Sequence, residues 1–173
     1  IIGQSLAKRW SYAVSKIYSY YITKLYRESF DLFACNGILF NHESPRRGET
    51  FVTRKITLGL NDLINGNKKN IILGNLNAKR DWGHAKDYVE MQWKIMQHKY
   101  PEDFVISTGK SYSIKQFANI IKTITKSKTD LKFGSLPYRK GEIMVSKISN
   151  MDIHNLGWKP KYDLAALVKE MVA

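Results

Sequence analysis

The sequence LFACNGILFNHESPRRG, residues 32–48, contains the clearest structural signal in this chain of 173 residues. Its first nine residues form a short apolar run, which ends at Asn41 and His42. A short run of this kind is typical of a strand buried inside a parallel sheet. Residues 44–49, with Ser, Pro and Gly among them, have the composition of a surface turn. We therefore expect a buried parallel strand over 32–40, followed by a loop.

Helix and strand patterns alternate on both sides of this stretch. Apolar spacing predicts helices over 10–29, 51–64, 84–99 and 114–125 and from 163 onward, and short strands over 70–73, 104–106 and 131–133. Gly66 and Pro101 stand where helices should end, and Ser113 is a good N-cap. This alternation predicts an α/β fold with a mainly parallel sheet. If only these strands formed the sheet, the run 32–40 would have an exposed edge or face.

The composition narrows the classes of partner. The chain has 28 Lys+Arg against 15 Asp+Glu, a net charge of +13 and a pI near 9.7. This charge favours an anionic partner: nucleic acid, a membrane surface or a phosphorylated small molecule. However, no block of five basic residues occurs, and the scattered lysines fit solvated faces better than a binding stripe. The 43% of hydrophobic residues excludes a disordered basic tail.

Several sites and locations are excluded or disfavoured by what the sequence lacks. It has no run of about 20 apolar residues, so we expect no membrane partner. Cys35 is the single cysteine and cannot form an internal disulfide, which fits a reducing cytoplasm. The four histidines lack Cys or carboxylate neighbours at ligand spacing, so no zinc site is expected. There is no G-x-G-x-x-G fingerprint, and Gly109-Lys110-Ser111 only imitates the end of a phosphate-binding loop.

Tyr12 and Lys16 stand four residues apart on the first predicted helix, so they share one face. An ammonium near a tyrosine favours the phenolate, which suits an acid/base, and the lysine can also hold a ribose hydroxyl. Tyr20 and Lys24 repeat the same spacing, so the spacing alone does not identify a site.

Longer motifs give this pair a context. Residues 9–16, RWSYAVSK, resemble the active-site helix of extended short-chain dehydrogenase/reductases that act on nucleotide sugars. Residues 36–48, 51–55, 73–75, 80–89 and 101–105 are similar, almost residue for residue, to the GDP-mannose 4,6-dehydratase family. The resemblance is dense over roughly residues 10–125, and motifs of this length do not arise by coincidence.

The resemblance implies roles for particular residues. Tyr12 would be the catalytic acid/base, and Lys16 would bind the nicotinamide ribose. His42 and Arg47 would contact NADP, and the Arg46-Arg47 loop would join subunits of a homo-oligomer. The residues implied for the GDP-sugar are Asn41, Lys55, Arg80, Arg139 and Glu142. Guanidinium groups suit diphosphate oxygens, and a carboxylate suits ribose hydroxyls or a guanine edge.

The resemblance also implies a fold and a reaction. It predicts the C-terminal part of a Rossmann-type parallel sheet plus a smaller mixed α/β substrate-binding lobe, with the N-terminal glycine-loop half absent. Residues 1–173 would be one incomplete module, in which 1–43 and 84–108 edge the cofactor-binding sheet and 44–83 and 109–173 form the substrate-binding lobe. The family oxidises GDP-mannose at C4 with NADP, eliminates water across C5 and C6, and returns hydride to C6. Because the dinucleotide loop is missing, we predict that the isolated chain is inactive.

Other interpretations stay open. The chain could be a non-catalytic nucleotide-sugar-binding lobe, a subunit that needs a separately encoded N-terminal half, or an epimerase-type relative, since residues 137–160 resemble nucleotide-sugar epimerases. A basic nucleic-acid-binding module is disfavoured because aromatic and basic residues do not interleave. Arg80-Asp81 could form a surface ion pair that caps the next helix, and the backbone could satisfy His42. We expect Trp82, Trp93 and Trp158 to serve in packing.

Overall fold

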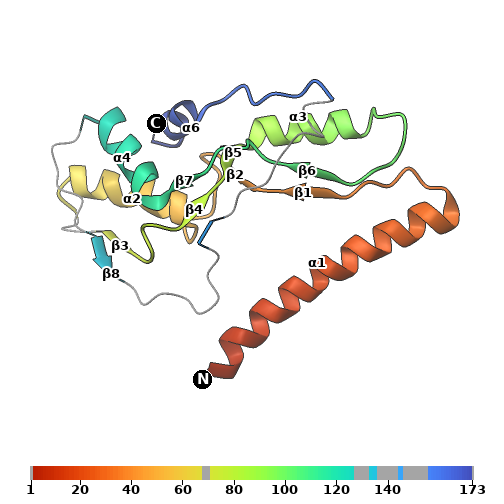
Figure 1. Cartoon of the computed structure of the whole chain (residues 1–173). Helices are drawn as coiled ribbons and strands as arrows, with labels where there is room; N and C mark the ends of the chain where they lie inside the picture. Colours follow the sequence, from red (N-terminus) through yellow and green to blue (C-terminus); the bar gives the residue numbers. More distant parts are fainter. Residues whose placement is uncertain (1, 68–70, 127–132, 136–143, 146–155, 173) are drawn as a thin grey trace.

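The structure is a computed structural model that describes residues 2–67, 71–126, 133–135, 144–145 and 156–172, with the backbone alone for 2–10 and 133–135 (Figure 1). Its helices are α1 (Ile2–Phe30), α2 (Val52–Ile64), α3 (Ala85–Ile95), α4 (Ile114–Ile124) and α6 (Leu164–Val172). Its strands are β1 (Gly37–Leu39), β2 (Asn41–Glu43), β3 (Ile71–Leu73), β4 (Lys79–Arg80), β5 (Trp82–His84), β6 (Phe104–Ile106), β7 (Tyr112–Ser113) and β8 (Phe133–Ser135).

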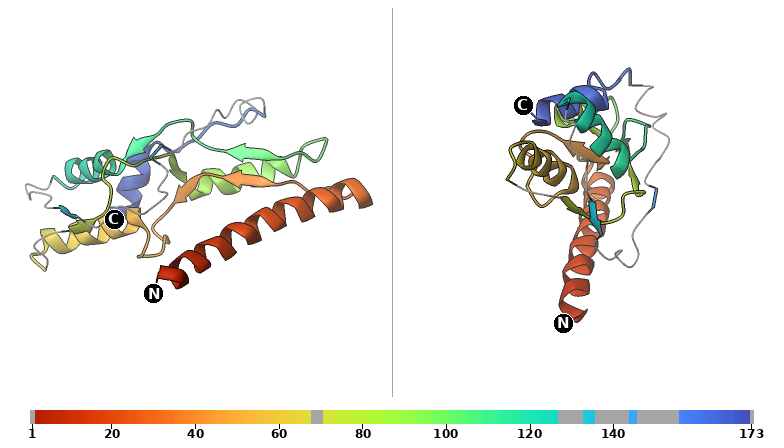
Figure 2. Two further views of the ribbon diagram at one scale, coloured as in Figure 1. Left: turned by 60° about the horizontal axis from the view of Figure 1, so that its bottom comes forward. Right: turned by 90° about the vertical axis from the view of Figure 1, so that its left-hand side faces the viewer.

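The strands pair mainly in parallel. β1 pairs with β6, β2 with β5 and β3 with β8, all parallel, and β4 with β7 is the antiparallel pair. Strands that are distant in sequence therefore lie side by side, with helices packed beside them (Figures 1 and 2). The predicted α/β class with a mainly parallel sheet is confirmed. β5 and β7, which the sequence patterns did not predict, are too short for their alternation to stand out.

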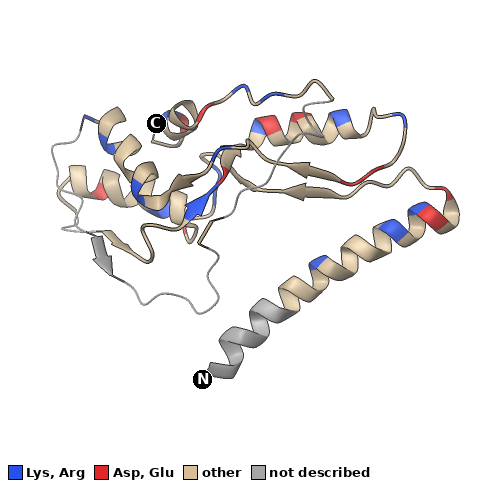
Figure 3. Ribbon diagram, viewed as in Figure 1, with Lys and Arg blue, Asp and Glu red and all other residues tan. Residues whose placement is uncertain are grey.

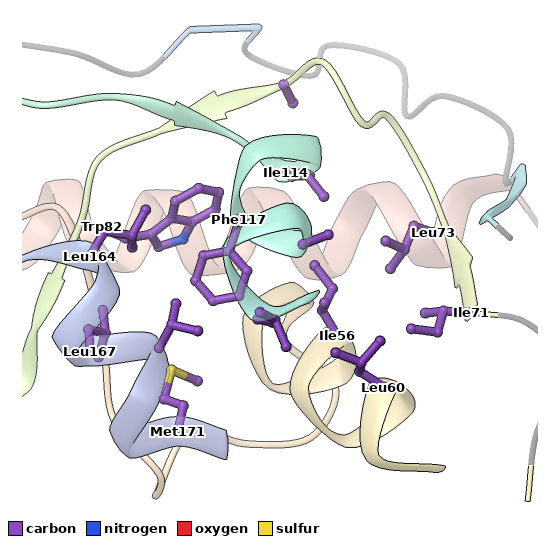
Figure 4. Close-up of a cluster of buried hydrophobic side chains, with 14 of the residues drawn as sticks. Ile56, Leu60, Ile71, Leu73, Trp82, Ile114, Phe117, Leu164, Leu167 and Met171 are labelled. Atoms are coloured by element: carbon purple, nitrogen blue, oxygen red, sulfur yellow. The ribbon is translucent and has the colours of Figure 1, made fainter. Parts of the chain in front are cut away.

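Two clusters of buried apolar side chains form the hydrophobic core of the described residues. The larger one packs α2, α4 and α6 against β3 and β5, with Leu60, Phe117 and Val168 fully buried (Figure 4). The smaller one packs α3 against β6 and includes Met91, with Trp158 from the segment before α6. Burial of this apolar surface positions the strand ends that carry the candidate site.

Several predicted helix ends are confirmed. Ser113 caps α4 through a capping box, in which its hydroxyl accepts from the Gln116 backbone N–H and the Gln116 side chain accepts from the Ser113 N–H. Gly66 follows α2 with a φ of 73°, the left-handed conformation that favours glycine. The helix predicted over 84–99 instead ends at Ile95, because hydrogen bonds between residues three apart tighten its last turn.

The apolar run over 32–40 differs from its prediction. Only Gly37–Leu39 forms a strand there, and the Phe40 N–H donates to the carbonyl of Ile106 (2.9 Å), so that β2 continues beside β5. The expected burial is also wrong: Ile38 keeps 46% of its surface exposed. Among the described residues, none pairs with the outer edge of β1, which matches the expectation of an open edge.

Helix α1 runs along one side of the molecule and diverges from it toward the N-terminus (Figures 1 and 2). Its apolar side chains are exposed, including Val14, Ile17 and Tyr21. None of the helices in the described part of the chain combines the length and the apolar character that spanning a lipid bilayer requires. The helix pattern over 10–29 therefore predicted the element correctly, although this face is not buried within the chain.

The tryptophans divide into two groups. Trp82 and Trp158 are buried, as expected for packing residues, and the Trp158 indole N–H donates to the Asp87 carbonyl (3.2 Å). Trp93 is 64% exposed, so the packing role predicted for it is wrong for the described part of the chain. It lies on the outer side of α3, away from the cluster that Met91 joins.

Candidate active site

An open pocket of about 400 Å³ lies where α1, the end of β1 and β2 meet the loop that follows β2. Its lining residues are Tyr12, Leu39, Phe40, Asn41, His42, Arg47 and Phe51. Four of these are residues whose roles the sequence resemblance implied, and they come from helix α1 and from the continuous stretch 39–51. The fold therefore brings Tyr12, Asn41, His42 and Arg47 to one place.

Tyr12 and Lys16 share one face of α1, as their spacing requires. The Lys16 ammonium nitrogen lies 5.5 Å from the centroid of the Tyr12 ring, within the range of a cation–π contact. Tyr12 is 66% exposed toward the open side of the pocket. The pair thus places an acid/base candidate and a neighbouring positive charge beside the cavity.

His42 has both a backbone partner and a place in the pocket. Its Nδ1 lies 2.9 Å from the Phe40 carbonyl oxygen, which can only accept, so Nδ1 donates this bond and Nε2 is left for another partner. The ring packs against Tyr88, with centroids 5.2 Å apart. The interpretation of a backbone-satisfied histidine is confirmed, and it is compatible with a ligand at Nε2.

Arg47 is held at the edge of the pocket by two contacts. Its Nε lies 3.1 Å from Oε2 of Glu43, and the centre of its guanidinium group lies 3.6 Å from the centroid of the Phe51 ring. The ring fixes the plane of the guanidinium, and the carboxylate attracts it by charge, since the geometry at Nε does not make this close contact a hydrogen bond. A group held in this way is prepared to receive phosphate oxygens on its remaining nitrogens.

Glu43 is a residue of this site that the sequence analysis missed. It is 1% exposed, and its Oε2 accepts a 2.7 Å hydrogen bond from the Thr53 hydroxyl on α2. Burial raises the pKa of Glu43 above its ordinary value, although Thr53, Arg47 and His42 act in the opposite direction. The available sequence signal was a carboxylate four residues before Arg47, inside the family motif over 36–48 and directly before the predicted turn at 44–49.

Asp81, between β4 and β5, binds the segment that follows β6. The interpretation as a surface ion pair is wrong, because Asp81 is fully buried and accepts hydrogen bonds from the Thr108 N–H (3.1 Å), the Thr108 hydroxyl (2.7 Å) and the Gly109 N–H (2.8 Å). Burial raises its pKa, against the effect of these bonds. The cap of α3 is instead His84, whose Nδ1 accepts from the Lys86 N–H.

The other predicted substrate residues do not line this pocket. Lys55 is exposed on the first turn of α2, and Arg80 lies in β4, where one of its terminal nitrogens donates to the Lys79 carbonyl (2.8 Å). Arg139 and Glu142 lie outside the described residues. The geometry therefore tests neither the pair at 139 and 142 nor a diphosphate contact from Lys55 and Arg80. Within the described ranges, no group of three His, Cys, Asp or Glu side chains could hold a metal ion.

Tyr88 presents a buried hydroxyl with no hydrogen-bond partner among the described residues. Burial, together with the charges of Asp81, Asp87 and Glu43, raises the pKa of this phenol. We expect Tyr88→Phe to raise the free energy of unfolding by about 1 kcal/mol, because it removes the desolvation cost of the hydroxyl and keeps the ring.

Urea denaturation of the variant and the unmodified chain measures this difference. Tyr100→Phe, at an exposed tyrosine, is the control and should leave the unfolding midpoint unchanged. A loss of stability in Tyr88→Phe would mean that the hydroxyl makes a bond in solution.

The similarity to known proteins agrees with this arrangement. A family model described as GDP-mannose 4,6 dehydratase matches residues 4–171. The chain belongs to this family. A GDP-mannose 4,6-dehydratase of Vibrio cholerae serotype O1 is 43% identical over an alignment 195 residues long, gaps included. This alignment covers 95% of this chain and 52% of that protein. GDP-mannose 4,6 dehydratase 2 of Caenorhabditis elegans is 45% identical, over 95% of this chain and 48% of that protein.

The chain thus spans about half the length of the curated relatives that it matches. Among solved structures, RMD from Pseudomonas aeruginosa, complexed with NADPH, superposes with a TM-score of 0.84. The match covers 93% of this chain and 54% of that chain, at 17% sequence identity. This likeness confirms the expected fold class, a part of a Rossmann-type α/β domain.

Proposed function

We propose that this chain carries the C-terminal part of the active site of a GDP-mannose 4,6-dehydratase that uses NADP. The observation that carries the proposal is the convergence of Tyr12, Asn41, His42 and Arg47 on one pocket. The family membership, over nearly the whole chain, supports the same chemistry. The substrate, the cofactor and the reaction are proposals because the chain covers about half of its relatives.

The pocket residues suit the roles proposed for them. Tyr12 would take the proton from the sugar C4 hydroxyl, and the Lys16 ammonium would stabilise the phenolate and hold a ribose hydroxyl. Arg47 and Nε2 of His42 would bind the cofactor, and Asn41 the sugar. When bound, NADP supplies the hydride acceptor that these residues lack. The half-buried setting of Arg47, held by one carboxylate and one ring, fits an anionic group at the rim.

The remaining parts of the proposal depend on residues away from the pocket. Lys55, Arg80, Arg139 and Glu142 would hold the GDP moiety, and the exposed loop at Arg46 would join the subunits of a homo-oligomer. A cytoplasmic location is consistent with the free thiol of Cys35. The division into a cofactor sheet edge and a substrate-binding lobe also remains a prediction.

Calorimetric titration of the purified chain tests the binding part of the proposal. We expect saturable binding of GDP-mannose in preference to UDP- and CDP-sugars, and binding of NADP. Arg47→Ala should weaken NADP about tenfold, because one charge-assisted contact contributes about 1.4 kcal/mol. Tyr18→Phe, at an exposed position on α1 outside the pocket, should have no effect.

Turnover gives the second readout. We expect no dehydration of GDP-mannose by the isolated chain with added NADP, since its sequence contains no glycine-rich dinucleotide loop. Binding without turnover would agree with the proposal and also with a non-catalytic binding lobe, and restored turnover on adding the N-terminal half of a relative would separate the two. Binding of neither ligand would contradict the proposed site.

A further inference from the structure

One polar cluster joins α1 to the rest of the described chain, and Asp103 is at its centre. Oδ1 of Asp103 accepts hydrogen bonds from a terminal nitrogen of Arg27 (2.8 Å), the Asn36 N–H (3.2 Å) and the Asn36 amide (3.0 Å). The Tyr20 hydroxyl also donates to this carboxylate. Four donors from two segments therefore converge on one half-buried carboxylate.

The partners of Asp103 are tied to each other as well. Arg27 donates a second bond to the Ala34 carbonyl (3.2 Å), and the Asn36 amide donates to the Tyr20 carbonyl (3.3 Å). The Phe104 N–H donates to the Asn36 carbonyl (2.8 Å), directly at the start of β6. The cluster thus links α1, the segment that enters β1, and the residue that precedes β6.

The position of this cluster on α1 makes it an orienting contact. Tyr20 lies eight residues after Tyr12, about 12 Å along a helix that rises 1.5 Å per residue. Residues 11–19 are exposed, and the helix diverges from the body over this length (Figures 1 and 2). A tilt of about 15° at the cluster would therefore move Tyr12 by about 3 Å, which is enough to disrupt proton transfer.

We propose that Asp103 is a positioning residue, which fixes the direction of α1 through Arg27 and Asn36 and so holds Tyr12 at the pocket. This inference rests on the proposed function only in giving Tyr12 a chemical role. The orientation of α1 itself follows from the contacts of the cluster.

The charge state of Asp103 suits this role. Partial burial acts to raise its pKa, but hydrogen bonds from Arg27, Tyr20 and Asn36 outweigh it and lower that pKa to about 2. The carboxylate is therefore ionised at every pH at which the enzyme would work. The same charge raises the pKa of the Tyr20 phenol, which keeps that group protonated as a donor.

In the ribbon of Figure 3, coloured by residue type, charged residues are sparse along the middle of α1, and acidic and basic residues gather near its C-terminal end. Lys16 and the pair Lys24–Glu28, 3.7 Å apart on the helix surface, are exposed charges. A surface pair of this kind does little to orient a helix. Among the side chains described on α1, the half-buried pair of Arg27 with Asp103 is therefore the electrostatic contact that can fix the helix to the body.

Distance measurement between two spin labels tests the proposal in the full chain. One label is placed at Ser15→Cys on α1 and the other at Lys115→Cys on α4, with Cys35 replaced by Ser; both label sites are exposed. We expect one narrow distribution of distances in this background. Asp103→Asn should broaden the distribution about twofold and shift its mean, because the neutral amide offers Arg27 a weaker acceptor.

Matched variants make the result specific. Glu102→Gln, at the exposed neighbouring carboxylate, should leave the distribution unchanged, and Asp103→Glu should restore most of its sharpness. If Asp103→Asn does not fold, Arg27→Gln removes one donor and should give an intermediate broadening. A distribution that stays sharp in Asp103→Asn or in Arg27→Gln would overturn the proposal. The distance measurement needs no ligand, so its outcome can be interpreted even if the proposed function is wrong.

Discussion

Gly83→Ala is expected to lower the free energy of unfolding by about 3 kcal/mol, at the upper end of the range for overpacked cores. A Cβ atom at this position would lie 2.4 Å from Cε2 of the Tyr88 ring and 2.9 Å from Cγ2 of Thr108. Tyr88 cannot retreat, because it is 1% exposed and packs edge-on against Trp158. The added methyl must therefore separate β5 from α3.

Chemical denaturation, followed by tryptophan fluorescence, measures this loss. Gly74→Ala is the matched control, because a Cβ atom added there would meet no other atom within 4 Å and the φ of Gly74 is not positive. This control substitution should change the free energy of unfolding by less than about 0.5 kcal/mol. The double variant of Gly83→Ala with Tyr88→Leu should be more stable than the sum of the two single losses predicts, since the smaller side chain relieves the clash. Additive losses would contradict the steric explanation.

The substitution Gly83→Ala should also disturb the candidate active-site pocket. Gly83 is the register partner of His42 in the β2–β5 pair, and the ring of His42 packs against Tyr88. Displacement of the Tyr88 ring would therefore move the histidine that lines the cavity. The close approach at Gly83 explains why this glycine stands in the middle of an otherwise bulky strand.

The sequence predicted this part of the molecule only in outline. The motif over residues 80–89 was associated with the correct family, and Arg80 was singled out for its charge. The tertiary contacts of Gly83 and Asp81 were not predicted, because each depends on a segment distant in sequence: Thr108 approaches both of them. Local patterns contain no information about which distant segment will pack there.

The same reason explains the errors at the strand edge. Residues 32–40 were assigned to one strand that ends at Phe40, whereas the chain moves at that residue from a partner in β6 to one in β5. Periodicity cannot show a change of partner. The helices were predicted well because their caps and apolar spacing are local, as the capping box of Ser113 illustrates.

Within the candidate site, the residues proposed to contact ligands were predicted, but the buried residues that hold them in place were not. Arg47 was implied by resemblance, but Glu43, which stands in the same quoted motif, received no role. Asp103 stood inside a quoted motif with no role assigned to it. Such supports are recognised by burial and by hydrogen-bond partners, which only the folded structure provides.

Glu43→Ala is expected to lower the free energy of unfolding by about 2 kcal/mol, because it leaves the Arg47 guanidinium without its anion and the Thr53 hydroxyl without its acceptor. Thr53, at 1% exposure, and the buried Nε atom of Arg47 are poorly placed to reach water. Glu43→Gln keeps an oxygen for Thr53 and removes the buried charge, so it should lose clearly less than Glu43→Ala.

A double-mutant cycle isolates the ion pair. The loss of stability in the double variant should be about 1 kcal/mol smaller than the sum of the losses in Glu43→Ala and Arg47→Ala, because each change removes the same contact. Arg46→Ala provides the control, since Arg46 is an exposed arginine one residue away. A coupling energy near zero would mean that the pair does not hold Arg47 in solution.

The pH dependence of stability gives an independent check on Glu43. Because its pKa is raised in the folded protein, the folded state binds this proton more tightly than the unfolded state does. The contribution of Glu43 to stability is therefore greatest below its ordinary pKa of 4.5 and falls as the pH rises through the folded pKa. Glu43→Gln should remove this part of the slope in urea titrations above pH 4.5, and an unchanged slope would show that Glu43 is not buried with Arg47 as the structure places it.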